Sequence, residues 1–390
     1  MKIVDVRAKW LHSPIPEAKQ HVSDFGRIAS FDCVLVEIET DEGLIGYGEG
    51  KAAVGSAGSC AAIVSCVNHD LRPQLIGQDP RQITRIWETL YNGTRDHYAL
   101  SRGRAFPVLG RRGLLISAVS GIDMALWDLK GKVTGLSVTD LLGGSCYETL
   151  PAYASGGWAD VDKIGEQLLG YTKHGFKGVK MRVGVMDDTP IASAKRVAAA
   201  REALGPDIKL MVDAHGTMSV PEAKRFCRLT EEHDLFWFEE PCNSDNFAGT
   251  AEVRATTATP IAMGESEFTR FDIRDALLAK AADVLQPDAA IIGGITEARR
   301  VAVLAETFQV ALAPHCWGSA LSFMAGISVA FASPASIILE FSLGSNPLLH
   351  DLVEESIECD ADGNMTAPTA PGLGLTINQD FVKEITRPIN

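Results

Sequence analysis

The sequence has few of the features that mark nucleic-acid-binding, membrane or disulfide-bonded proteins. Its 36 Lys and Arg residues are outnumbered by 50 Asp and Glu, for a formal net charge of −14, which argues against nucleic acid or an anionic membrane as a partner. The eight cysteines include no Cys-x-x-Cys pair and no metal-finger spacing, a pattern typical of free thiols in a reducing compartment. The segment Met1–Asp5 lacks the apolar stretch of a signal peptide. We therefore expect a cytoplasmic protein.

Long apolar runs are nearly missing as well. One uncharged run, Ala320–Leu339, reaches the length of a membrane span, but serine, glycine and proline interrupt it. We interpret it as a buried helix followed by a strand. With 390 residues, of which 46% are hydrophobic, the chain is long enough for two domains, or for one large barrel with an accessory module.

The N-terminal part has the pattern of a small α+β module. Val34–Glu39 alternates in the manner of a strand, Asp41–Gly43 predicts a hairpin turn, and Leu44–Gly48 predicts the returning strand. Apolar residues at helical spacing follow from Leu115, and Gly131 is expected to close that helix. We assign residues 1–130 to this N-terminal α+β capping domain.

Short apolar strands alternate with helices from Thr149 onward. Eight strands are predicted, at Leu150–Ser155, Gly178–Val183, Lys209–His215, Leu235–Pro241, Pro260–Ser266, Val284–Ala289, Val310–Cys316 and Ser336–Ser342. Repeated βα units of this length predict a modified (β/α)8 TIM barrel rather than an open sheet. We assign residues 131–355 to the barrel, and expect residues 356–390 to return to the capping domain.

Each strand from the second to the eighth ends with ionisable side chains. In chain order these are Lys180 and Arg182, Asp213 and His215, Glu239, Glu265, Asp288, His315 and Glu340. A single carboxylate after a strand is usually a helix cap or a surface residue. A barrel, however, brings the carboxyl ends of all its strands to one mouth. Burying so many charges is too costly unless they neutralise one another or bind an ion.

Three of these residues suggest which ion. Asp213, Glu239 and Glu265 end consecutive predicted strands at equal spacing, and no cysteine accompanies them. A site made of carboxylate oxygens favours Mg²⁺, or Mn²⁺ as a substitute, over Zn²⁺. The sequence therefore predicts one such ion per chain.

The remaining ionisable residues predict a site for an acid. Lys180 and Arg182 lie two apart on one strand, so both point to the same face, where they offset negative charge and can meet a substrate carboxylate. On an ordinary strand the same pair would be a solvated face. His315 and Asp288 end adjacent strands, and a carboxylate beside an imidazole orients the ring and raises its basicity, as a general base requires. A lone histidine after a strand is more often a structural hydrogen-bonding group.

The motifs resemble the mandelate racemase-like group of the enolase superfamily over essentially the whole chain. The residues that carry the resemblance are Ala118–Asp128, Trp237–Pro241 and Pro371–Gly374, together with the spaced ligand series. The resemblance implies Mg²⁺ on the three carboxylates, a His315–Asp288 base, and Lys180 near the substrate carboxylate. It also implies that Glu340 is a hydrogen-bond donor or acid that stabilises an enediolate. The muconate-cycloisomerase-like group would instead place a catalytic lysine where Asp288 stands.

Two positions depart from the group's pattern. Arg182 stands where a second lysine is common, and a guanidinium is a poor proton acceptor, so a one-base reaction through His315 is favoured over two-base racemisation. His215 stands where relatives often have asparagine, and its role is open. With Trp317, it joins Lys180, Arg182 and Glu340 as a candidate for binding substrate.

Members of the group with this dyad resemble acid-sugar dehydratases. We therefore expect Mg²⁺-dependent removal of the α-proton of a hydroxy-carboxylate, loss of the β-hydroxyl and formation of a 2-keto-3-deoxy acid. The stretch Pro314–Gly318 is similar to that of galactarolactone-type cycloisomerases, so a sugar-lactone cycloisomerase is the main alternative, followed by a racemase or epimerase. A silent scaffold on an inherited fold is a further alternative.

We expect specificity to depend on capping-domain loops around Pro14–Arg27 and Lys51–Ala57, which would cover the barrel mouth. The group's habit suggests a homo-oligomer, either a dimer or an octamer, and the basic segment Ser101–Arg112 is a candidate subunit contact.

Overall fold

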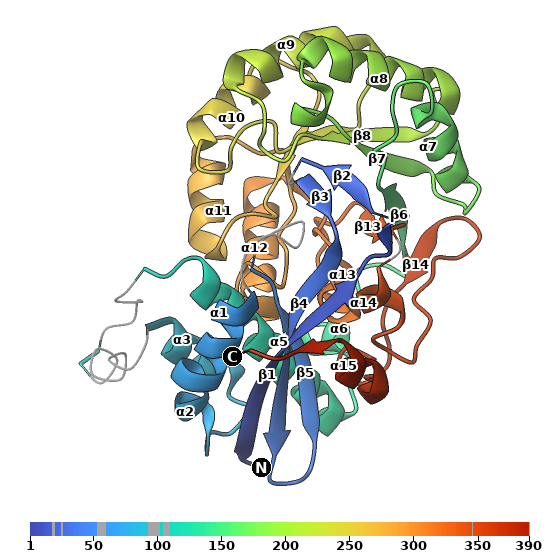
Figure 1. Ribbon diagram of the computed structural model, residues 1–390. Helices are drawn as coiled ribbons and strands as arrows, with labels where there is room; N and C mark the ends of the chain where they lie inside the picture. The colour runs from blue at the N-terminus through green and yellow to red at the C-terminus, as the bar shows by residue number, and fades with distance from the viewer. Residues whose placement is uncertain are drawn as a thin grey trace.

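The computed structural model describes residues 1–17, 20–24, 26–52, 60–92, 102–103, 110–344 and 346–389. It contains an antiparallel sheet with helices packed on it and a parallel sheet surrounded by helices (Figure 1). This architecture confirms the predicted α/β barrel with an N-terminal α+β part.

The N-terminal sheet is built from long strands. Its order is β15-β1-β4-β5, with β1 at Ile3–Pro14, β4 at Ser30–Thr40, β5 at Ile45–Gly50 and β15 at Thr386–Arg387. The predicted hairpin turn joins β4 to β5 and contains Gly43 at φ +79°. A second hairpin, of β2 (His21–Ser23) and β3 (Gly26–Ile28), lies between β1 and β4 in the chain and extends toward the barrel (Figure 1).

Helices cover one face of this sheet. They are α1 (Cys60–Ser65), a π-helical turn (Cys66–Leu71), α2 (Arg72–Leu75) and α5 (Leu114–Thr134). Helix α3 (Ile83–Asn92) packs on α5, and α6 (Val138–Leu141) packs on α5 and on the later helix α13 (Ala320–Phe331). Helix α5 approaches β5 closely, since a Cβ on Gly48 would lie 2.1 Å from the carbonyl oxygen of Gly121.

The predicted end of α5 at Gly131 is wrong. The helix continues to Thr134, and Gly135 caps it in the left-handed conformation at φ +70°. Gly131 has a different role, because a Cβ there would lie 2.3 Å from the backbone nitrogen of Gly372. The glycine thus permits close packing of the C-terminal segment on α5 rather than a turn of the chain.

The eight predicted barrel strands are all present and mutually parallel. They are β6 (Thr149–Ser155), β7 (Gly178–Arg182), β8 (Lys209–Asp213), β9 (Trp237–Glu239), β10 (Ile261–Met263), β11 (Val284–Leu285), β12 (Ala311–Leu312) and β13 (Leu339–Ser342). A parallel bridge between Leu312 and Ser336 links the two ends of the sheet. Most strands are shorter than predicted, so Glu265, Asp288 and His315 lie just beyond their strands rather than within them.

Helices alternate with these strands around the outside of the barrel (Figure 1). They are α7 (Ile164–Thr172), α8 (Pro190–Leu204), α9 (Val220–Thr230), α10 (Phe247–Arg254), α11 (Thr269–Leu278), α12 (Gly294–Phe308) and α13 (Ala320–Phe331). The capping box of Ser219 and Glu222 begins α9 as the sequence predicts. The apolar run from Ala320 forms α13 followed by β13, and no helix among the described residues is long and apolar enough to cross a membrane.

The chain beyond the barrel runs back to the N-terminal sheet. It contains α14 (Pro347–His350), β14 (Asn364–Thr366), which pairs with β6, and α15 (Gln379–Ile385). Strand β15 then pairs antiparallel with β1 through Trp10 and Leu11. The domain limits at residues 130 and 355 stay predictions.

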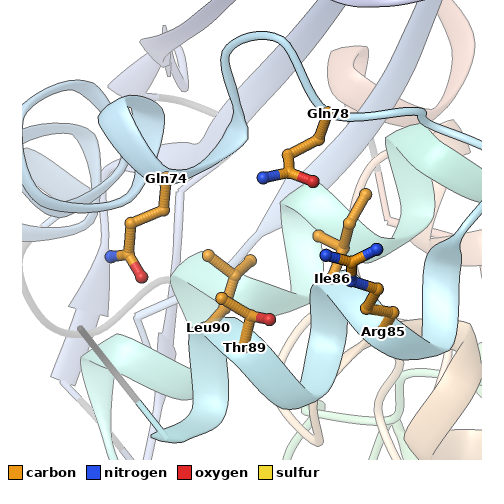
Figure 2. A pocket seen from close by; sticks show the side chains of 6 residues that line it. All are labelled: Gln74, Gln78, Arg85, Ile86, Thr89 and Leu90. Atoms are coloured by element: carbon orange, nitrogen blue, oxygen red, sulfur yellow. The ribbon is translucent and has the colours of Figure 1, made fainter. Parts of the chain in front are cut away.

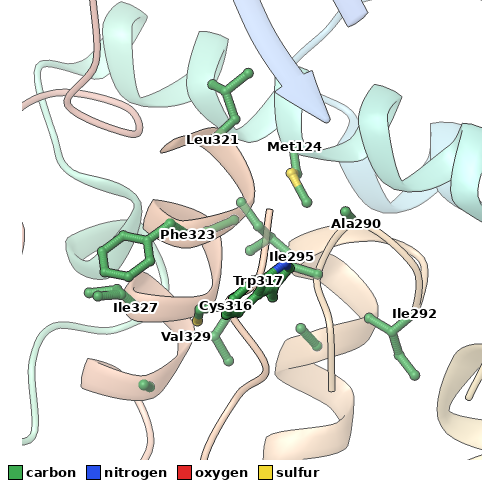
Figure 3. Packing of buried hydrophobic residues seen from close by; sticks show 14 of the residues in the cluster. Met124, Ala290, Ile292, Ile295, Cys316, Trp317, Leu321, Phe323, Ile327 and Val329 are labelled. Carbon is green, nitrogen blue, oxygen red and sulfur yellow. The ribbon is translucent and has the colours of Figure 1, made fainter. Parts of the chain in front are cut away.

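A continuous apolar core joins the two parts of the molecule. Figure 3 shows Met124 of α5 above Ile295 of α12 and beside the residues of α13. Polar contacts fix the same interface, because Asp123 accepts hydrogen bonds from the backbone and hydroxyl of Thr296 at 2.8 and 2.6 Å. The N-terminal part is therefore held against the barrel by both apolar and polar contacts.

Candidate active site

Three carboxylates meet at the carboxyl ends of neighbouring barrel strands. Asp213 and Glu239 are the last residues of β8 and β9 and are paired in register, and Glu265 follows β10 by two residues. Their ligand oxygens all lie within 4.8 Å of one another, and all three side chains are buried. The structure thus brings together the three residues that the sequence nominated as metal ligands.

The chemistry of this cluster fits a divalent cation. Both carboxylate oxygens of Glu265 are buried, and neither accepts a hydrogen bond from the described residues. Burial, with the added charges of Glu240 and Glu239, raises the pKa of Glu265 to about 8 despite the opposing effect of His315. A bound ion would supply the charge that these oxygens lack, and an all-oxygen donor set suits Mg²⁺ or Mn²⁺.

The two cations of β7 face this cluster. The ammonium of Lys180, which is fully buried, pairs with Glu239, lies 3.0 Å from Glu340 and lies 3.6 Å from Asp213. Burial alone would lower its pKa, but Glu239 and Glu340 outweigh burial and raise it. Lys180 is therefore a fixed positive charge at the centre of the barrel.

Arg182 is held between acid and aromatic groups. One of its terminal nitrogens pairs with Asp213, and its guanidinium carbon lies 5.8 Å from the ring centres of both Trp158 and Trp317. The two indoles meet edge to face, with centroids 5.7 Å apart. Arg182 therefore presents its guanidinium between a carboxylate and two aromatic rings.

His315 and Asp288 form the expected pair. Nδ1 of His315 lies 2.8 Å from Oδ2 of Asp288, whose other oxygen accepts a hydrogen bond from the backbone of Ala290 at 2.7 Å. Burial opposes ionisation of Asp288, but Lys51 and His315 outweigh it and lower its pKa to about 2. Because an ionised carboxylate only accepts, Nδ1 carries the proton and the lone pair of a neutral ring lies on Nε2.

The free face of this imidazole points at the carboxylate cluster. Nε2 lies 3.5 Å from Glu265 and 3.9 Å from Glu340. Burial lowers the pKa of His315, but Glu265, Glu340 and Asp288 together raise it. The ring is therefore placed to exchange a proton with a molecule that binds beside Glu265.

Glu340, on β13, accepts a hydrogen bond from the backbone of Cys316 at 2.9 Å in addition to its ion pair with Lys180. Burial would raise its pKa, but Lys180 and His315 lower it well below the ordinary value. The carboxylate is ionised in this arrangement and cannot donate a hydrogen bond. The donor role expected for Glu340 would require its protonation and stays a prediction.

His215 connects the cluster to the β2–β3 hairpin. Its Nδ1 lies 2.6 Å from Asp24, between β2 and β3, and its Nε2 lies 3.3 Å from Asp213. The backbone of His215 is left-handed at φ +44°, which aims the side chain back over the end of β8. The sequence nominated the Pro14–Arg27 loop as a cover for the mouth, but it did not single out Asp24.

Other parts of the nominated loops lie outside the described residues. In the Lys51–Ala57 segment, only Lys51 and Ala52 are described. In the Ser101–Arg112 segment, only residues 102–103 and 110–112 are described. A pocket elsewhere in the N-terminal part, lined by residues of α2, α3 and the loop between them, contains none of the nominated site residues (Figure 2).

Lys51 was not singled out by the sequence as a contact of the dyad, nor Glu49 as a contact between β5 and the barrel. Glu49 belongs to β5 and Lys51 follows it, and both side chains are buried against the barrel. Nζ of Lys51 donates to Asp288 at 2.9 Å and to the carbonyl of Trp317. The sequence does contain a hint of their role, because two charged residues within Gly48–Lys51 end an apolar strand. Nothing in the local sequence, however, indicates that their partners are more than 200 residues away.

Comparison with known proteins places the chain in a family. Residues 5–143 match the model of the mandelate racemase / muconate lactonizing enzyme N-terminal domain, and residues 163–381 match the enolase C-terminal domain-like model. The chain belongs to the mandelate racemase and muconate lactonizing enzyme family of the enolase superfamily. The resemblance inferred from the motifs is thus confirmed.

Named relatives in this family act on acid sugars and their lactones. The chain is 37% identical to D-galactarolactone cycloisomerase of Agrobacterium fabrum, with 100% of both chains covered. It is 35% identical to D-galactonate dehydratase of Ralstonia nicotianae, with 91% of each chain covered. The family members therefore include both reaction types that the sequence suggested.

Solved structures of the superfamily share the fold. A racemase from Streptomyces coelicolor with bound magnesium has a TM-score of 0.85 at 30% identity, covering 99% of this chain and 100% of that one. The 3,6-anhydro-D-galactonate cycloisomerase of Zobellia galactanivorans has a TM-score of 0.83 at 29% identity, with 100% of both chains covered. The whole chain, including the returning C-terminal segment, thus follows the architecture of this superfamily.

Proposed function

We propose that the chain is a Mg²⁺-dependent acid-sugar dehydratase that removes the α-proton of a hydroxy-carboxylate through His315. The observation that carries the proposal is the position of the His315 ring. Asp288 holds its Nδ1, and its Nε2 lies 3.5 Å from Glu265 of the carboxylate cluster. A base and a candidate cation site are therefore adjacent, as removal of a proton next to a carboxylate requires.

The charged residues define how an acid substrate would be held. Asp213, Glu239 and Glu265 would bind the Mg²⁺ ion, and the bound ion would neutralise the substrate carboxylate and so acidify the neighbouring C–H bond. Lys180, already charged and buried, would lie beside the same carboxylate. Arg182 would contact a hydroxyl or second acid group near the mouth, together with Trp317.

The proton transfers can then be assigned to His315. Nε2 accepts the α-proton, and the electron pair of the broken C–H bond moves into the carboxylate to give an enediolate. That pair next expels the β-hydroxyl group, which takes the proton from the His315 imidazolium and leaves as water. The resulting enol tautomerises to a 2-keto-3-deoxy acid, so the base is returned neutral at the end of the cycle.

Arg182 is not suited to act as a second base. Arg182 occupies the position of the second lysine, and its guanidinium is paired with Asp213 and stacked against two indoles. Because a guanidinium does not accept a proton at ordinary pH, racemisation or epimerisation through two bases is disfavoured. The same reaction with Mn²⁺ in place of Mg²⁺ is expected.

A sugar-lactone cycloisomerase is the second candidate. It is favoured by the 37% identity to a D-galactarolactone cycloisomerase over the full length of both chains. The α-proton step would be the same, but a ring oxygen of the lactone would leave in place of hydroxide, and no water would be released.

One experiment separates these functions. The protein is incubated with Mg²⁺ in D₂O and a panel of aldonates, aldarates and their lactones, and the products are identified by NMR. Formation of a 2-keto-3-deoxy acid supports dehydration, and ring opening without loss of water supports cycloisomerisation. Exchange with inversion at the α-carbon would contradict the one-base proposal. Absence of exchange on every acid with Mg²⁺ bound would contradict the proposed substrate class.

A further inference from the structure

Lys51 enters the barrel from the N-terminal part of the chain. It directly follows β5, and its side chain is only 3% exposed. Its backbone nitrogen donates to the carbonyl of Ala290 at 3.2 Å. Lys51 is therefore fixed at both its backbone and its side chain to the segment that carries Asp288.

The ammonium of Lys51 and the ring of His315 share one carboxylate oxygen. Oδ2 of Asp288 lies 2.9 Å from Nζ of Lys51 and 2.8 Å from Nδ1 of His315. The carbonyl of Trp317, two residues after the histidine, accepts a second hydrogen bond from the same ammonium. Lys51 thus contacts the partner of the base on one side and the backbone next to the base on the other.

The remaining oxygen of Asp288 is also occupied. Oδ1 accepts from the backbone of Ala290 at 2.7 Å and from the hydroxyl of Ser322 at 3.3 Å. The carboxylate therefore has donors on both oxygens, and its plane is fixed. Among the described residues, Lys51 is the only permanently charged cation that contacts the fully buried Asp288 carboxylate. Without Lys51, this carboxylate would reorient or become protonated.

The orientation of Asp288 matters because it decides which nitrogen of His315 is free. While the carboxylate is ionised and accepts from Nδ1, the lone pair stays on Nε2, which faces Glu265. A protonated or rotated Asp288 would no longer hold that tautomer and ring angle. The contact made by Lys51 therefore bears on the proton-transfer step and not only on stability.

We propose that Lys51 is a positioning residue for His315. It fixes the orientation of the Asp288 carboxylate, so that packing of the N-terminal part on the barrel sets the tautomer and ring angle of the general base. The proposal rests on the proposed function, in which His315 takes the α-proton. It assigns to the N-terminal part a share in the proton transfer in addition to its expected cover of the barrel mouth.

Glu49 provides a matched control on the same interface. Its carboxylate accepts hydrogen bonds from the backbone nitrogens of Ser319 and Ser322 at 3.0 and 3.1 Å. Like Lys51 it is buried and connects the end of β5 to the barrel. Glu49 has no direct hydrogen bond to Asp288 or His315 among the described contacts; it accepts from the backbone nitrogen of Ser322, whose hydroxyl donates to Asp288. Glu49→Gln therefore weakens the same docking contact and leaves the contacts of Lys51 and His315 with Asp288 in place.

The test compares Lys51→Met with Glu49→Gln in the whole 390-residue chain. With the acid that the wild type uses, Lys51→Met is expected to lower kcat and α-proton exchange about 10- to 100-fold, as does loss of other groups that orient a functional imidazole. KM and the Kd for Mg²⁺ should stay within about threefold, since the ligand cluster is untouched. Glu49→Gln should lower the melting temperature but keep kcat within about threefold.

A second measurement does not depend on the substrate. The hydrogen-bonded Nδ1 proton of His315 should give a low-field ¹H NMR resonance, assigned by its loss in His315→Asn. This resonance should disappear or shift in Lys51→Met and persist in Glu49→Gln. If Lys51→Met does not fold, Lys51→Gln, which keeps a polar donor without the charge, takes its place in both measurements.

Unchanged kcat and an unchanged resonance in the lysine variant would overturn the proposal. An equal loss of kcat in Glu49→Gln would also overturn it, because docking alone would then explain the effect. Failure of the proposed function looks different: the wild type itself would exchange no α-proton on any acid, while the NMR comparison would still decide whether Lys51 positions the ring.

Discussion

Nε2 of His315 and Oε2 of Glu265 lie 3.5 Å apart at the mouth of the barrel, although they follow strands β12 and β10, which are not neighbours in the sheet. The proposed base and a proposed metal ligand thus lie side by side. A substrate whose carboxylate meets the ion would place its α-carbon within reach of the imidazole. This geometry makes the functions of the dyad and of the carboxylate cluster separable by mutation.

Loss of the imidazole should abolish proton transfer and leave metal binding intact. For His315→Asn we expect α-proton exchange in D₂O to fall about 10²- to 10⁴-fold, the contribution typical of a positioned general base. The exchange rate should also fall in Asp288→Asn, because the His315 ring would lose the carboxylate that orients it. The Kd for Mg²⁺, measured by calorimetry, serves as the control. Turnover that survives in a folded His315→Asn protein would show that another group is the base.

Removal of one proposed metal ligand should weaken Mg²⁺ binding, in contrast to removal of the imidazole. In Glu265→Gln the cluster loses one negative charge and one strong oxygen donor, so Mg²⁺ affinity should fall about 10- to 100-fold or more. Chelation with EDTA should abolish exchange in the wild type, and added Mg²⁺ or Mn²⁺ should restore it.

The matched control is Glu267→Gln, because Glu267 is equally buried nearby but lies outside the three-carboxylate cluster. If both variants lose metal affinity equally, Glu265 is not a specific ligand.

The product of exchange should keep its configuration. Arg182 cannot take a proton from the face opposite His315, so deuterium should enter at the α-carbon without inversion. Arg182→Met should raise KM more than it lowers kcat, since a cation between Trp158 and Trp317 is placed to bind substrate. Chiral chromatography of the recovered acid measures the configuration. Recovery of both epimers would contradict the one-base assignment.

The barrel could be predicted because its information is local. Each strand is a short apolar segment bounded by helix signals, and the ionisable residue at its end is visible in the same few letters, as in Trp237–Pro241. The parallel arrangement then forces Asp213, Glu239 and Glu265 together. The metal cluster and the dyad thus follow from strand order alone.

The contacts that cross from the N-terminal part could not be predicted in the same way. Lys51 meets Asp288 across 237 positions of the chain, and Asp24 meets His215 across 191. Which loop reaches which strand end depends on how the N-terminal part packs on the barrel, and no local periodicity encodes that packing. The error at Gly131 has the same origin, because the residue was expected to end the helix, whereas its role is to allow the close approach of Gly372.

Gly131 should tolerate no side chain, despite lying in a helix. Alanine normally stabilises a helix over glycine by about 1 kcal/mol, but here its Cβ would fall 2.3 Å from the backbone nitrogen of Gly372 and 2.6 Å from the carbonyl of Leu136. Backbone atoms cannot relieve this clash by a change of rotamer, so we expect Gly131→Ala to lower the free energy of unfolding by about 1–3 kcal/mol or more.

Gly170 provides the comparison. It lies within α7, where an added Cβ would meet no atom within 4 Å, so Gly170→Ala should be neutral or stabilising by up to about 1 kcal/mol. Urea denaturation of both variants, followed by circular dichroism, measures the difference. Equal stability of the two would mean that the C-terminal segment does not pack on α5 through Gly372. A loss confined to Gly131→Ala would show that this contact fastens the returning chain to the N-terminal helix.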